Sequence, residues 1–117
     1  MPVTFSKSSG VTKKYSVDIT ATAESDVAGI WEYISQDKPE AGSAFILQLE
    51  EQVGTLENFP ERCQLVPENE LLGTAYRHLV YGNYRTIFKI TGHRVIILRV
   101  LHGTRLLDIG LLEGLTE

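Results

Sequence analysis

Four basic side chains near the end of the chain are of the types that cleave RNA without a metal ion. They are Arg85, Arg99, His102 and Arg105. Such cleavage needs a base for the 2′-hydroxyl proton, cations that stabilise the charge on the phosphate, and a donor for the leaving oxygen. The four residues supply parts of that set and are our candidate catalytic residues for a nuclease. For His102, a strand-end histidine bonded to backbone is an equally good interpretation. Arg85 and Arg99 can equally pair with Glu or Asp from the expected helices.

The segment that carries these residues is basic, although the whole chain is acidic. The 117 residues have a net charge of −4, yet the window 76–107 holds six Lys or Arg, all three histidines and no Asp or Glu. The rest of the chain has five basic and 15 acidic side chains, a balance of −10. This segregation predicts a dipolar molecule whose basic half is the candidate working surface. The net acidity disfavours broad binding to nucleic-acid phosphates.

Three expected strands must position the basic residues. The segments 76–81, 84–91 and 94–102 are rich in β-branched and aromatic residues. Two-residue turns containing Gly82 and Gly92 separate them, which predicts a three-strand antiparallel meander.

The last of these strands is apolar on both faces. Ile96, Leu98 and Val100 alternate with Val95, Ile97 and Leu101. In a simple register, Arg85 and Arg99 share an alternation class with Ile87 and Ile97 and lie on the face that no helix covers. The tail 106–115, a second copy or another protein should cover that face. Our partner-binding candidates are Arg77, Arg85, Ile87, Val95, Ile97, Arg99 and Leu101.

The N-terminal half predicts one strand and a helical hairpin. Residues 1–13 show no periodicity and are expected to form a flexible leader, and alternation from Tyr15 to Thr20 predicts a half-buried strand. Apolar residues at helical spacing predict two helices, over 22–36 and over 39–58. Thr22 is the expected cap of the first helix, and Trp31 of the same helix is expected in the core. The expected fold is α+β: a single domain, 14–117, with a small twisted antiparallel sheet, an N-terminal strand, an α-helical hairpin on one face and the C-terminal meander.

Several classes of site and of protein are not expected. Cys63 is the only cysteine, so a disulfide within the chain is excluded, and the three histidines lack metal-ligand spacing. We therefore expect no metal and no cofactor. The longest aliphatic run, Val95–Leu98, is far shorter than a membrane span, and we expect a cytoplasmic protein.

Two segments of the predicted meander resemble the RelE/ParE superfamily of plasmid-stabilisation toxins. The first is Gly82-Asn83-Tyr84-Arg85-Thr86-Ile87-Phe88-Lys89-Ile90, and the second runs from Val95 through Leu101-His102-Gly103-Thr104-Arg105. Upstream, Leu56-Glu57-Asn58-Phe59-Pro60-Glu61 resembles the family's end of its second helix. The likeness covers about residues 14–108. The leader departs from it, since such toxins usually begin at the first strand.

The resemblance implies the same fold and a toxin of a type II toxin–antitoxin system, neutralised by a cognate antitoxin. ParE-like members inhibit DNA gyrase, and RelE-like members cut mRNA on the ribosome. The nuclease set is incomplete here because no tyrosine follows Tyr84 and the tail is apolar and acidic, so we favour the ParE-like branch. A RelE-like endoribonuclease and a degenerate toxin that only binds its antitoxin remain alternatives. A homodimer or a heterotetramer with the antitoxin fits either branch.

Overall fold

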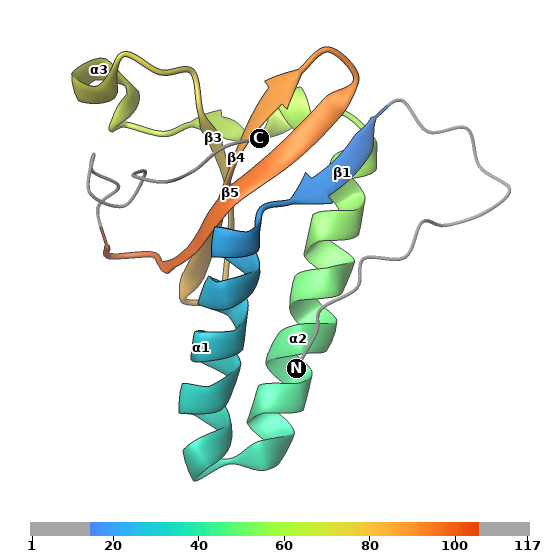
Figure 1. The fold of residues 1–117 in the computed structure, drawn as a ribbon, viewed down its shortest axis with the longest axis vertical. Helices are drawn as coiled ribbons and strands as arrows, with labels where there is room; N and C mark the ends of the chain where they lie inside the picture. The colour runs from blue at the N-terminus through green and yellow to red at the C-terminus, as the bar shows by residue number, and fades with distance from the viewer. Residues whose placement is uncertain (1–14, 106–117) are drawn as a thin grey trace, which may run out of the picture.

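A five-stranded twisted sheet carries a helical hairpin on one face in the computed structural model, which describes residues 15–105 (Figure 1). The strands are β1 (Ser16–Ile19), β2 (Gln64–Leu65), β3 (Arg77–Tyr81), β4 (Tyr84–Thr91) and β5 (Arg94–His102). The helices are α1 (Ala21–Asp37), α2 (Pro39–Gly54) and the single turn α3 (Asn69–Leu72). The predicted α+β fold is confirmed. The predicted leader 1–13 and the tail 106–115 lie outside the described residues.

The sheet is mixed rather than wholly antiparallel as expected. Its strand order is β1-β5-β4-β3-β2, and β1 pairs with β5 in parallel, Ser16 opposite Arg94 and Ile19 opposite Ile97. Parallel neighbours need a long crossover, and the helical hairpin between β1 and the meander supplies one. The predicted meander of β3, β4 and β5 is confirmed, with Gly82 and Gly92 at positive φ in its two tight turns.

Both long helices form where their apolar periodicity predicts them, but their first and last residues differ from the predicted ones. Thr20, not Thr22, caps α1, because Thr20 has the extended backbone of a cap residue and its hydroxyl accepts a hydrogen bond of 3.1 Å from the amide of Ala23. Pro39 occupies the first turn of α2, as expected. The α-helix ends at Gly54, and a 3₁₀ turn over Thr55–Glu57 completes the predicted length.

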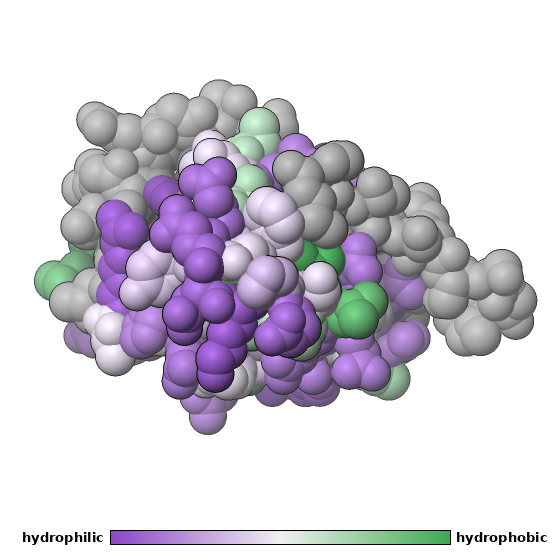
Figure 2. All heavy atoms as spheres, turned by 90° about the horizontal axis from the view of Figure 1, so that it is seen from below, coloured by the Kyte–Doolittle hydropathy of each residue, from purple (hydrophilic) through white to green (hydrophobic). Residues whose placement is uncertain are grey.

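The main core lies between the hairpin and the sheet. Leu49 and Val53 of α2 and Val27 of α1 pack on Phe88 and Ile97, all essentially inaccessible to solvent. Trp31 packs at the border of this core, as predicted. The hairpin projects beyond the strands, and seen from its end the molecule is mainly hydrophilic (Figures 1 and 2). The apolar stripes of both helices are therefore used against the sheet.

A β-bulge in β5 inverts its alternation. Phe88 lies opposite Ile97 and Ile87 opposite Arg99, so Leu98 is an extra residue without a partner on β4. Val95 and Ile97 face the helices before the bulge, and Val100 faces them after it. The expected simple register is therefore wrong: Ile97 and Ile87 lie on opposite faces of the sheet.

The second face of the sheet has a small apolar cluster of its own. Ile87, Ile96, Leu98 and Leu101 are at most 4% exposed. Leu72 and Tyr76, from the segment that precedes β3, pack against them. Part of the cover on the helix-free face thus comes from the segment between α2 and β3, which contains β2 and α3.

Burial of Tyr81 should make the free energy of unfolding fall at alkaline pH. Its hydroxyl lies 3.0 Å from that of Thr86, and burial raises the pKa of Tyr81 to about 12. Because the unfolded side chain ionises near pH 10, the contribution of Tyr81 is complete below pH 10 and is lost between pH 10 and 12. At pH 11 the loss should be about 1 kcal/mol. Urea unfolding of Tyr81→Phe at pH 8 and 11 should show a weaker pH dependence than the parent.

The matched control is Tyr33→Phe, because Tyr33 is 76% exposed. An equal effect of the two substitutions on the pH dependence would contradict the assignment to Tyr81.

Candidate functional site

Arg85, the first candidate catalytic cation, is part of a buried ion pair. Its guanidinium faces the carboxylate of Glu68 with two contacts, Nη2 to Oε2 at 2.5 Å and Nη1 to Oε1 at 3.3 Å. Both residues are buried, Arg85 at 4% and Glu68 at 8% exposure. Arg85 Nη2 also donates to the carbonyl oxygen of Arg105 at 2.7 Å. The pair ties the loop before α3, strand β4 and the end of β5 together.

His78 completes this buried group. Arg85 Nη1 lies 3.2 Å from His78 Nδ1, and because a guanidinium can only donate, Nδ1 must accept. Burial, and then the neighbouring charge of Arg85, lowers the pKa of His78, which favours the neutral ring that this bond needs. Arg85 Nε is buried with no hydrogen-bond partner within residues 15–105. The group therefore holds Arg85 in a structural position, turned away from solvent.

Arg99, the second candidate cation, is paired with α1. Its Nε and Nη2 donate to the two carboxylate oxygens of Asp26 at 2.7 and 2.6 Å. This side-chain hydrogen bonding raises the pKa of Arg99. Asp26 Oδ2 also accepts from the backbone amide of Val100 at 3.0 Å. One carboxylate thus neutralises Arg99 and occupies the edge of β5 just beyond the end of β1.

The segregation of charge along the sequence does not produce an equally segregated surface. Besides the two pairs above, Arg94 forms an exposed pair with Asp18. Arg77 donates to the carbonyl oxygens of Glu61 and Cys63 at 3.1 and 2.6 Å. Three arginines of the basic window are therefore paired with acids from outside it.

The remaining two candidates line one hollow. His102 and Arg105 are exposed at the end of β5, and both border a hollow of about 410 Å³ between α1 and the sheet. The bulge places His102 on the helix side, where its ring meets that of Tyr84 edge to face at 5.7 Å. His102 Nδ1 lies 2.8 Å from the hydroxyl of Thr104. The structure thus separates the four candidates into the buried Arg85, the partly buried Arg99 and two exposed residues.

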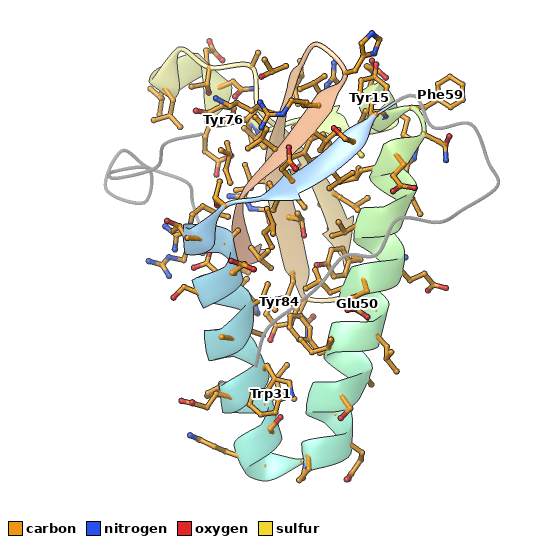
Figure 3. All side chains as sticks on the ribbon, turned by 45° about the vertical axis from the view of Figure 1, so that its right-hand side comes forward. Tyr15, Trp31, Glu50, Phe59, Tyr76 and Tyr84 are labelled. Carbon is orange, nitrogen blue, oxygen red and sulfur yellow. The ribbon has the colours of Figure 1, made fainter. Side chains whose placement is uncertain are left out.

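Two tyrosines that the sequence did not single out complete this hollow. Tyr33 of α1 is 76% exposed at its rim. Tyr84 lies on the helix side of β4, where Figure 3 shows it in the space between the two helices, and its ring packs 5.2 Å from that of Phe45. Burial raises the pKa of Tyr84. Tyr33 breaks the polar face of its helix, and that was the available signal in the sequence.

The partner-binding candidates fall into three groups. Ile87 and Leu101 lie on the helix-free face, as expected, but they are buried within the chain. Val95 and Ile97 lie under the helices, because the bulge inverts the alternation. The third group, Arg77, Arg85 and Arg99, already has hydrogen-bond or ion-pair partners within the chain.

Between 15 and 105 there is no group of three His, Cys, Asp or Glu side chains placed to hold a metal ion. In the same range, no helix has the length and apolarity needed to cross a membrane.

Comparison with known proteins gives a consistent result. A sequence model of the ParE toxin of the type II toxin–antitoxin system parDE matches residues 17–107. No curated protein sequence matches. Among solved structures, the chromosomal ParDE system from P. aeruginosa aligns with a TM-score of 0.63 and 21% identity, over 78% of this chain and 98% of that one. The toxin–antitoxin complex RelBE2 from Mycobacterium tuberculosis aligns with a TM-score of 0.54 and 25% identity, over 76% and 98%.

The pair of Arg85 and Glu68 should matter for stability. Substituting Glu68→Gln leaves a buried guanidinium without its counter-charge, and we expect a loss of about 3 kcal/mol in the free energy of unfolding, measured with urea. Glu70→Gln is the matched control, since Glu70 is exposed two residues away, and it should change stability by less than about 0.5 kcal/mol. Replacing both partners, Arg85→Met with Glu68→Leu, should restore most of the loss. Equal effects of the two Glu→Gln changes would contradict this role.

Proposed function

The chain belongs to the family of ParE toxins of type II toxin–antitoxin systems, and from this premise we propose that it inhibits DNA gyrase by binding, without chemistry of its own. We further propose that a cognate antitoxin neutralises it. Because gyrase acts on the bacterial chromosome, the proposed activity is cytoplasmic.

One observation carries the choice of binding over catalysis. Two of the four candidate nuclease residues, Arg85 and Arg99, each already have one carboxylate partner that makes two contacts with the guanidinium group. A cation with such a partner contributes little to stabilising a developing phosphate charge, because its own charge is compensated. His102 and Arg105 alone supply one base and one cation. Transition-state stabilisation on phosphate would thus depend on a single guanidinium.

The residue types that line the hollow support a protein as the proposed partner. Tyr and Arg are enriched among the residues that contribute most to protein–protein binding, and the hollow combines Tyr33, Tyr84 and Arg105. Both solved relatives are named as toxin–antitoxin systems or complexes. We therefore propose an antitoxin as the physiological partner of this chain, in a heterotetramer or a smaller complex.

The RelE-like alternative rests on His102 and Arg105, which share the hollow and are both exposed. In that case the chain would cut mRNA on the ribosome with His102 as the base. The degenerate-toxin alternative keeps only the antitoxin contact.

The primary test is a supercoiling assay with purified DNA gyrase. We expect the chain to inhibit supercoiling and expect premixing with the antitoxin to relieve the inhibition. We expect no cleavage of ribosome-bound mRNA by the parent chain, and none by the double variant His102→Ala, Arg105→Ala.

Cleavage of ribosome-bound mRNA by the parent, lost in that double variant, would replace the gyrase proposal with the nuclease. Absence of both activities, together with harmless expression without antitoxin, would leave the degenerate toxin.

A further inference from the structure

The hollow between α1 and the end of β5 is lined by residues that suit a ligand with an aromatic ring and a neighbouring negative charge. Tyr33, Tyr84 and His102 present aromatic rings, while Ile30 and Val100 add aliphatic surface. Its volume of about 410 Å³ lies at the small end of ligand pockets, enough for one large side chain. Tyr84 is held from behind by Phe45 and beside by His102, so the ring surface is formed in advance.

The charges around the hollow select the occupant. Asp26 is the acidic residue in its lining, and Arg99 neutralises it at 2.6 Å. Arg105 lies on the rim, exposed, with no side-chain ion pair among residues 15–105. Among residues 15–105, the lining therefore offers one net cation, which matches one carboxylate.

A longer polyanion fits less well. Besides the neutralised Asp26, the helix α1 that forms one wall carries three acids, Glu24, Glu32 and Asp37, and no Lys or Arg. A nucleic-acid strand following the helix would meet these carboxylates beyond the hollow, and their charge would oppose its binding. A protein segment with a single acid avoids this repulsion.

We propose that the hollow is the anchor pocket for a bulky, preferably aromatic, side chain of the neutralising protein partner, and that a carboxylate next to it in sequence pairs with Arg105. The proposal rests on the proposed function only for the identity of the partner. The recognition itself follows from the rings of Tyr33, Tyr84 and His102 and from the one uncompensated cation.

Gly29 is a position at which a substitution can place a side chain in the hollow. It lies on α1, lines the hollow, and a Cβ added there meets no atom within 4 Å. Gly29→Leu should therefore place an aliphatic side chain in the hollow and raise the thermal stability, because leucine favours the helix more than glycine does. Gly54→Leu is the matched control: Gly54 is also helical, also open, and not part of the hollow.

The experiment titrates two blocked dipeptides, acetyl-Trp-Glu-amide and acetyl-Trp-Gln-amide, into the full-length protein, followed by amide chemical shifts. We expect the Glu peptide to shift the amides of Gly29, Tyr33 and His102 and to bind about tenfold more tightly than the Gln peptide. Gly29→Leu should abolish both, and Gly54→Leu should change neither. Arg105→Gln should keep the weak binding of the Gln peptide and remove the preference for Glu.

Several results would overturn the proposal: no peptide binding to the parent, binding unaffected by Gly29→Leu, or tighter binding of uridine monophosphate than of the Glu peptide. The last would make the hollow a nucleotide site. Because this titration contains no gyrase and no antitoxin, its failure is separate from failure of the proposed function. Gyrase inhibition without peptide binding would refute only the anchor pocket, and peptide binding without inhibition would refute only the gyrase target.

Discussion

The carboxylate of Asp26 joins the first helix to the sheet at the point where the sheet would otherwise have an open edge. Strand β1 covers β5 only as far as Ile97, and Thr20 then turns the chain into α1. Beyond that point the amide of Val100 would lack a strand partner, and Asp26 accepts its hydrogen bond together with two from Arg99. An unpaired strand edge costs hydrogen bonds and invites association, so this one side chain replaces a strand. The wall and floor of the hollow therefore have a fixed relative position.

The secondary structure could be predicted because each element has a strong local signal, whereas the faces of β5 could not. Helical spacing in α1 and α2 and glycine turns around β4 are local patterns. Strand β5 is apolar on every residue from Val95 to Leu98, so its pattern does not say which residues face the helices. The bulge at Leu98 is held by bonds from distant positions, including the Thr20 hydroxyl on the Leu98 carbonyl. Nothing near Leu98 in the sequence encodes it.

The candidate site could be predicted only as a set of residue types. The positions of Arg85, Arg99, His102 and Arg105 were visible, but their partners were not. Asp26 is 73 residues from Arg99, and Glu68 is 17 residues from Arg85 in a loop without periodicity. The sequence pattern therefore left open whether Arg85 and Arg99 are exposed or paired with acids, and the fold supplies a counter-charge for both. Tyr84 was overlooked because an aromatic residue at strand spacing usually belongs to the core.

The buried pair also sets an energetic condition on any nuclease activity. A phosphate could use Arg85 only after displacing Glu68, which would leave a carboxylate buried at 8% exposure without its partner. Breaking such a pair costs about 3 to 5 kcal/mol, a large part of the roughly 5 to 15 kcal/mol that stabilises a small domain. The displacement would also release the bond from Arg85 to the Arg105 carbonyl. Catalysis by Arg85 therefore requires the segment before β3 to rearrange, whereas binding through Tyr33, Tyr84 and Arg105 requires no such change.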